Sequence, residues 1–297
     1  MDVSEATRRP TNHHLRRTPW RSTEKLARAG RQVARKEHVV PRLHYARFAF
    51  DRQQHLYCLD KVSGALRVTA ADRLYIRDFY NFMFAGQMRD DIEMALGVIE
   101  NRTPRVLKTF DRTNAGASFS FTDQDRYAMS LYLAALHLRS PRMRSWVLDD
   151  LVKKASRAVA LRFAAAGPRY WGSARALLEG SVRVTPEEQA ALVVFRELNR
   201  VGRIIFASNW SLAIRPKAPH FVLGDAPGIG FVPPRGGWFL FVPISPERAI
   251  AVDRARQEGA AFEMPAANAV RMNALAYEAS VHTVAARDKA ELDALIP

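Results

Sequence analysis

The stretch Thr122–Pro141, with the sequence TDQDRYAMSLYLAALHLRSP, predicts a helix enclosed by the rest of the protein. Thr122 can cap the first turn, and Pro141 ends the helix. Asp123 and Asp125 lie near its N-terminus, where the helix dipole favours negative charge. Between these ends the helix has almost no polar face: the apolar and aromatic positions are Met129, Leu131, Tyr132, Leu133, Ala134, Ala135, Leu136 and Leu138. A helix that is apolar all round is usually a core helix.

The last turn of this helix carries two polar side chains, His137 and Arg139. An arginine in or beside a hydrophobic core needs an anionic or hydrogen-bonding partner, because burying an unpaired charge is costly. The sequence therefore predicts that acidic residues from elsewhere in the chain meet this end of the helix.

The composition is that of a globular protein. The 297 residues can form one large domain or two small ones, and 48% of them are hydrophobic. No apolar run approaches the ~20 residues of a membrane span, and the start, MDVSEATRRP, lacks the apolar core of a secretory signal. The single cysteine, Cys58, excludes an intrachain disulfide and a cysteine-based zinc cluster. These features favour a cytoplasmic protein.

The formal net charge of +15 is the strongest compositional signal. Residues 1–37 contribute ten Lys/Arg against four Asp/Glu and form a basic extension, predicted to be partly disordered, with a helix from Ser22. Such charge favours a nucleic-acid partner or an anionic surface. The alternative is a solubilising extension in a basic protein that binds nothing acidic, since Trp20 is the only aromatic residue there that could stack on a base.

Two carboxylates before the central helix are candidate site residues. Residues 88–103 predict an amphipathic helix, on which Glu93 and Glu100 lie within about 20° of each other at the border of the apolar face, roughly 10.5 Å apart along the axis. They can converge on a group between them, but chelating one ion requires further ligands. The alternative is that both are solvated residues at the boundary of the helix.

The rest of the chain indicates an α+β fold with a predominantly helical body. Alternating segments at 54–60 and 65–69, joined through Gly64, predict a small N-terminal β-hairpin. Residues 71–84 predict an irregular or helical connector, and 142–167 and 185–208 predict helices. Short extended segments at 210–214, 220–225, 237–245 and 248–252 predict a C-terminal antiparallel sheet. A helix over 266–280, a last strand and a short terminal helix from Asp288 follow.

Asp225 stands at the end of a predicted strand, in GDAPGIG. Loops at strand ends commonly carry functional residues, which makes Asp225 a site candidate. The alternative is a turn aspartate that hydrogen-bonds its own backbone. The glycines of this segment do not match a dinucleotide-binding or P-loop pattern.

Several blocks resemble the bacterial family known as domain of unknown function 4238. They include HVVPR (38–42), Ile92-Glu93 with Ile99-Glu100, LHLRSP (136–141), LGDAP (223–227) and PISP (243–246). The family more often has Gln in place of His137, and Ser-Asp-Asn-Pro where this chain has Gly-Asp-Ala-Pro. The resemblance spans roughly 38–286 and implies one α+β domain over 38–297. Its recurring polar positions are His38, Glu93, Glu100, His137, Arg139, Asp225 and Asn273, and a polar positioning role fits His137 better than a base, because relatives carry Gln there.

These residues allow two functional hypotheses. The first is a divalent-metal-dependent hydrolase, nuclease-like, in which His38, Glu93, Glu100 and Asp225 hold Mg²⁺ or Mn²⁺. In it, Arg139 orients a nucleic-acid phosphate, and His137 belongs to the same catalytic set. The second is a non-catalytic nucleic-acid-binding or interaction protein, in which the same residues form a buried structural network. The two hypotheses differ in whether these side chains line one open cleft.

Overall fold

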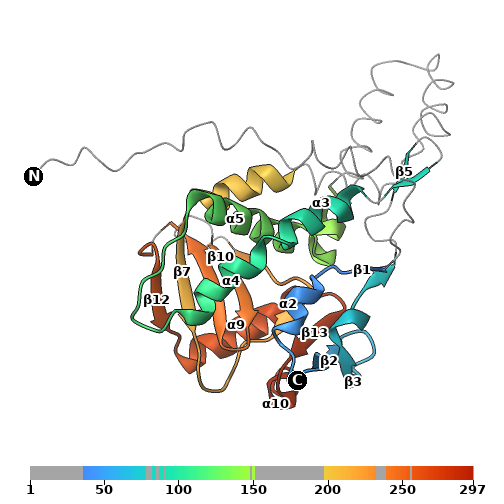
Figure 1. Cartoon of the computed structure of the whole chain (residues 1–297). Coiled ribbons are helices and arrows are strands. Elements are labelled where there is room, and N and C mark those ends of the chain that lie inside the picture. The colour runs from blue at the N-terminus through green and yellow to red at the C-terminus, as the bar shows by residue number, and fades with distance from the viewer. Residues whose placement is uncertain are drawn as a thin grey trace, which may run out of the picture.

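The computed structural model describes residues 36–77, 82–84, 87–89, 91–147, 149–150, 197–231, 239–254 and 256–296 (Figure 1). The predicted basic extension over 1–37 therefore lies outside the described residues, except for its last two. The helices are α2 (Arg42–Ala46), α3 (Asp91–Glu100), α4 (Thr103–Arg112), α5 (Asp123–Leu138), α9 (Ala266–Ala279), α10 (Lys289–Asp293) and the 3₁₀ turn η2 (Ala71–Arg73). Residues 141–147 and 197–206 are also helical.

Four β-sheets are formed by the described strands. Five strands pair in the order β12 (Ala260–Glu263), β7 (Asn209–Ile214), β11 (Arg248–Asp253), β10 (Phe239–Ser245) and β9 (Ile229–Phe231). Four pair in the order β3 (Leu66–Ala70), β2 (His55–Asp60), β13 (Thr283–Ala286) and β8 (Leu223–Gly224). Two short pairs are β1 (Lys36–Glu37) with β4 (Ile76–Arg77), and β5 (Phe82–Phe84) with β6 (Gln87–Arg89).

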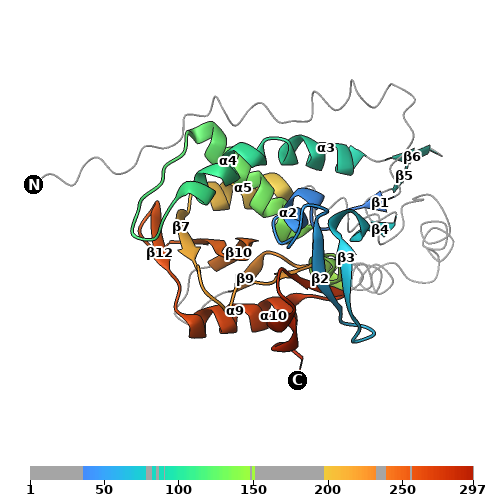
Figure 2. The ribbon, with the colours of Figure 1, turned by 60° about the horizontal axis from the view of Figure 1, so that its bottom comes forward.

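The five-stranded sheet separates two hydrophobic cores. Helices α3, α4 and α5 lie along one side of it, and α9 and α10 along the other (Figure 2). Strand β10 contributes side chains to both cores, because successive side chains of a strand point to opposite faces of the sheet. Leu240, Val242 and Ile244 join the core with α5, whereas Phe241 joins the core with α9. Strands buried on both faces explain the near-continuous apolar character of this part of the sequence.

The central helix has the predicted ends and the predicted burial. It runs from Asp123 to Leu138, and its N-cap Thr122 accepts a hydrogen bond from the backbone N–H of Asp125 at 3.2 Å. Its buried side chains point in every direction, and Tyr132, Leu133 and Leu136 are fully buried. The helical segment 197–206 crosses it at Gly202, where an added Cβ would lie 2.8 Å from Leu131. The α+β class and the N-terminal hairpin are likewise confirmed.

Several details differ from the sequence-based expectation. The helix predicted over 88–103 is α3 alone, and a second helix, α4, follows it after a short break. The segment 71–84 contains a 3₁₀ turn and short strands in its described part. The C-terminal sheet is mixed rather than antiparallel, because β12 pairs parallel to β7. Strand β8, which was expected in that sheet, pairs instead with the last strand, β13, and β13 pairs with β2 of the N-terminal hairpin.

Candidate functional site

Arg139 is held in the core by an ion pair with Glu100. Its guanidinium Nη1 donates to Glu100 Oε1 at 2.8 Å, and the two side chains are 2% and 27% exposed. Arg139 is the C-cap of α5 and Glu100 is the last residue of α3, so the pair joins the ends of two neighbouring helices. The sequence-based expectation that an acid meets this arginine is met by Glu100.

Two histidines and a tyrosine complete what we call the Arg139 cluster: His38, His44, Glu100, Tyr132 and Arg139. His44 is fully buried, and its Nε2 lies 2.7 Å from the carbonyl oxygen of Pro243. A carbonyl only accepts, so Nε2 donates, and Nδ1 accepts from the Tyr132 hydroxyl at 2.9 Å. Burial, together with the smaller effect of the Arg47 and Arg139 charges, lowers the pKa of His44 to about 3, although the hydrogen bond to the Pro243 carbonyl opposes the decrease. This imidazole is therefore neutral at physiological pH.

His38 lies beside the Glu100–Arg139 pair. Burial lowers its pKa, a backbone hydrogen bond with Asp72 and the Glu100 charge oppose this, and the Arg139 charge adds to it. Its Nε2 is buried and has no hydrogen-bond partner among the described residues. The structure therefore brings His38, Glu100 and Arg139 together, as the sequence analysis expected. Glu93, another candidate site residue, belongs to α3, but its side chain lies outside the described part of the structure.

Asp225 has a different environment. Its buried carboxylate accepts hydrogen bonds from the backbone N–H groups of Val281, His282 and Thr283 at 2.9, 2.7 and 3.2 Å. Burial raises the pKa of Asp225, while these three hydrogen bonds oppose the increase. The carboxylate thereby fastens the loop after β8 to the connection between α9 and β13. The charges of Asp225 and Arg139 both affect the pKa of the buried Tyr45, which burial raises. The Asp225 oxygens themselves are occupied by backbone donors.

His137 lies on the other side of α5 from Arg139. Two residues correspond to about 200° around a helix, so neighbouring polar residues of the last turn face opposite ways. The His137 ring packs against the backbone of Gly228 and Gly230, where an added Cβ would lie 3.0 and 3.1 Å from His137 atoms. The two glycines therefore leave the room that the imidazole occupies.

His137 lines a pocket of about 440 Å³, which we call the His137 pocket. Side chains of several elements contribute to it, among them Arg142, Trp146, Ile229, Leu275 and Glu278. His137 Nδ1 lies 3.1 Å from the carbonyl oxygen of Gly228 and must donate to it, which leaves Nε2 as a hydrogen-bond acceptor. Burial lowers the pKa of His137, so the ring is neutral. This pocket has the size of a small-molecule or nucleotide site.

The polar residues predicted as one site are thus divided between two places. His38, Glu100 and Arg139 form a buried cluster, with Asp225 nearby, whereas His137 belongs to a separate pocket. Within the described residues, His38, Glu100 and Asp225 do not form a group of three ligand atoms close enough to share one ion; His220, Asp288 and Glu291 do. Sequence reasoning missed His44. Tyr132 could have indicated such a residue, because the hydroxyl of a tyrosine on a buried apolar helix needs a hydrogen-bond partner from elsewhere in the chain.

None of the helices that the structure describes combines the length and the apolar character needed to cross a membrane. No curated protein and no solved structure matches the chain in comparisons with known proteins. A family model, described as a protein of unknown function (DUF4238), matches residues 36–290. This match covers most of the chain and confirms the resemblance inferred from the polar and proline-containing blocks. The chain belongs to the DUF4238 family.

Proposed function

We propose that this protein binds single-stranded nucleic acid at the His137 pocket and that the Arg139 cluster is part of its structural frame. The observation that carries the proposal is Trp146, whose side chain is 64% exposed although it lines the same pocket as Arg142 and His137. An exposed tryptophan offers a platform on which a base can stack. Arg142 can contact a phosphate, and the net charge of +15 attracts the polyanion.

His137 suits such a pocket as a recognition group. Its neutral ring presents the acceptor Nε2, which can take a hydrogen bond from an amino group on a base edge. A glutamine at this position can supply an acceptor as well, so binding does not require the imidazole as a catalytic base. The Glu100 carboxylate pairs with Arg139, and the Asp225 carboxylate accepts hydrogen bonds from backbone N–H groups. These partners support a structural role for both acids.

The test is the affinity for labelled single-stranded RNA and DNA, measured by fluorescence anisotropy at a fixed salt concentration. Trp146→Ala should weaken binding about 5- to 150-fold, because one stacked base contributes ~1–3 kcal/mol. Phe50→Ala is the matched control, since Phe50 is also an exposed aromatic residue, at 42%, and does not line the pocket. Equal affinities of the two variants would remove the pocket from the proposal.

A metal-dependent hydrolase is the second candidate, and His38 favours it. The buried Nε2 of His38 has no hydrogen-bond partner among the described residues, and the Glu100 charge acts on the same imidazole. Carboxylate oxygen, as on Glu100, is the ligand type that suits Mn²⁺ or Mg²⁺. Glu93 and Asp225 are the further ligands expected from the sequence, although the Asp225 oxygens accept hydrogen bonds from the backbone instead. In this proposal the ion activates water for attack on a nucleic-acid phosphodiester.

Divalent ions distinguish the two candidates. For the hydrolase, Mg²⁺ or Mn²⁺ raises the melting temperature, cleavage of RNA or plasmid DNA depends on the ion, and Glu100→Gln abolishes both effects in a folded protein. For the structural frame, the ions have no effect and Glu100→Gln lowers stability by ~3–5 kcal/mol, because it removes the negative charge that pairs with the buried Arg139 guanidinium. Glu197→Gln is the control: it removes an exposed ion pair with Arg200 and should cost about 1 kcal/mol or less.

A further inference from the structure

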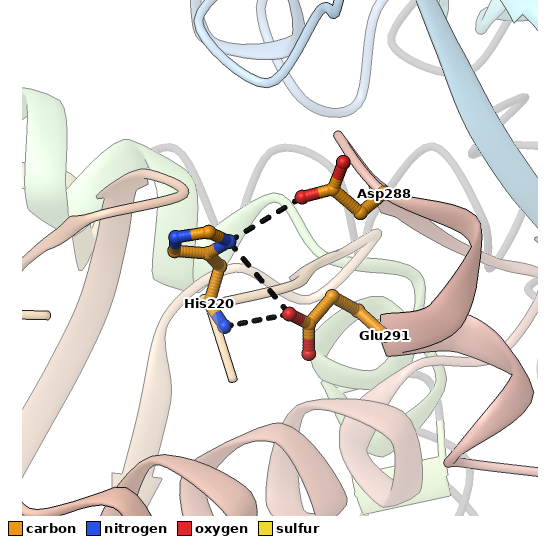
Figure 3. A group of neighbouring side chains, drawn as sticks. All are labelled: His220, Asp288 and Glu291. Carbon is orange, nitrogen blue, oxygen red and sulfur yellow. Dashed lines mark hydrogen bonds and ion pairs between the residues drawn. The ribbon is translucent and has the colours of Figure 1, made fainter. Parts of the chain in front are cut away.

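Three side chains that could act as metal ligands meet at a place that includes no residue of the Arg139 cluster and none that lines the His137 pocket. His220 precedes β8, whereas Asp288 and Glu291 belong to the start of α10 (Figure 3). His220 Nδ1 lies 3.3 Å from Asp288 Oδ2 and 3.7 Å from Glu291 Oε1. All three ligand atoms lie within 4.8 Å of one another. Two segments, which are 71 residues apart between His220 and Glu291, thus bring one nitrogen and two oxygens together.

These separations fit a tetrahedral ion. Zinc binds imidazole nitrogen and carboxylate oxygen at about 2.0–2.2 Å, so two ligands at a tetrahedral angle lie about 3.3–3.6 Å apart. The two distances from His220 Nδ1 bracket this range. A set of one imidazole and two carboxylates is also typical of ions that accept mixed nitrogen and oxygen ligands, such as Zn²⁺.

The nitrogen at the centre of this group has no hydrogen bond to satisfy it. His220 Nδ1 is buried, and it makes no hydrogen bond within the described residues, although both carboxylates lie at ion-pair distance. Most buried polar atoms have a hydrogen-bond partner, so this atom requires an explanation. A cation between the nitrogen and the two oxygens supplies one.

The group is held in place by contacts behind it. The backbone N–H of His220 donates to Glu291 Oε1 at 2.8 Å, and its carbonyl accepts from Asn273 Nδ2 at 2.6 Å. Asn273 Oδ1 accepts in turn from the backbone N–H of Val222 at 3.1 Å. His220 and Glu291 are mostly buried, at 18% and 10% exposure, whereas Asp288 is 52% exposed. The open side of the group therefore lies at Asp288, where water can complete a coordination shell.

We propose that His220, Asp288 and Glu291 bind one Zn²⁺ ion, with His220 Nδ1, Asp288 Oδ2 and Glu291 Oε1 as its protein ligands. The ion fastens α10 to the segment before β8, and a water occupies the fourth position. This site gives Asn273, a recurring polar position in the sequence analysis, the role of holding the backbone of the histidine ligand. The proposal is independent of nucleic-acid binding at the His137 pocket.

The test is isothermal titration of the full metal-free chain with Zn²⁺, paired with thermal unfolding. The wild type should bind one ion at this site and unfold at a higher temperature with zinc, because a ligand that binds only the folded state stabilises it. Asp288→Asn should weaken that binding by ~10-fold or more, a loss of the size that even supporting groups of metal sites produce. Asp288 is half exposed, so this substitution removes a ligand without disturbing the core.

His55→Gln is the matched control. His55 pairs with only one carboxylate, Asp51, at 2.7 Å. The His55→Gln variant should therefore retain the wild-type zinc affinity and the wild-type thermal shift. Glu291→Gln is a second variant, to be compared by affinity among molecules that circular dichroism shows to be folded. Zinc binding that is equal in wild type and Asp288→Asn, or the absence of a zinc-dependent thermal shift in the wild type, would overturn the site.

Discussion

His44 shows how a titratable side chain can be part of the core. Both ring nitrogens are used, one as donor to Pro243 and one as acceptor from Tyr132, and no water is needed to satisfy them. A hydrogen-bonded neutral imidazole costs little to bury, whereas a charged one costs several kcal/mol. The pKa of His44 is lowered to about 3 for this reason.

This lowered pKa predicts acid sensitivity. Below pH 6.5 the unfolded chain protonates at His44 while the folded protein does not, so unfolding takes up a proton and stability falls as the pH falls from about 6.5 toward 3. The loss is up to about 1.4 kcal/mol per pH unit from this residue. His38 and His137, whose pKa values are also lowered, act in the same direction.

The measurement is urea unfolding across this pH range for the wild type and His44→Gln. The variant should be less stable at neutral pH but should lose less stability on acidification. Asp225, whose pKa is raised by burial, titrates in the opposite sense, and comparing the two proteins cancels its contribution. If the free energy of unfolding changed with pH in the same way in both proteins, His44 would not be the cause of the acid sensitivity.

At the scale of elements, the last turn of α5 serves two environments. His137 and Arg139 lie on opposite sides of the helix, so α5 contributes to a pocket on one side and to an ion pair on the other. The sequence predicted the helix, its caps and the need for an acid at Arg139 because these are local or composition-based properties. It assigned both side chains to one cleft, because a list of polar residues carries no information about direction until the 100° step per residue is applied.

Two glycines offer a matched pair of substitutions at this scale. Gly228→Ala should destabilise the protein by ~1–3 kcal/mol and weaken binding at the pocket, because its Cβ would lie 3.0 Å from the Cα and Cβ atoms of His137 and 3.3 Å from its ring Nδ1, so that His137 would have to shift. Gly97→Ala should instead stabilise it by ~0.5–1 kcal/mol, since Gly97 lies within α3 with nothing within 4 Å of an added Cβ. Chemical unfolding and anisotropy titrations check both. If Gly228→Ala changed neither stability nor binding, the loop after β8 would be able to shift enough to accommodate the added methyl group.

At the scale of the molecule, the strands were predictable but their partners were not. Alternation and turn residues mark β2, β7, β10 and β11 locally, and all four exist. The sequence does not show that β13 and β8 pair with the N-terminal hairpin, because that pairing depends on α9 returning the chain across the far side of the five-stranded sheet. For the same reason Asp225, next to β8, came to bind the backbone at 281–283 rather than an ion at the central helix.

The charge of the whole chain leads to the last prediction. Residues 1–35, which precede β1, carry nine Lys/Arg and three Asp/Glu, or six of the fifteen net positive charges. Each phosphate neutralised on a single strand contributes about 0.7 to the slope of log affinity against log salt concentration. Deleting residues 1–35 should therefore flatten that slope and weaken binding most at low salt, while the melting temperature and the effect of Trp146→Ala stay the same. If the slope is unchanged, the phosphates are contacted by Lys and Arg side chains after residue 35, and the basic extension has no part in binding.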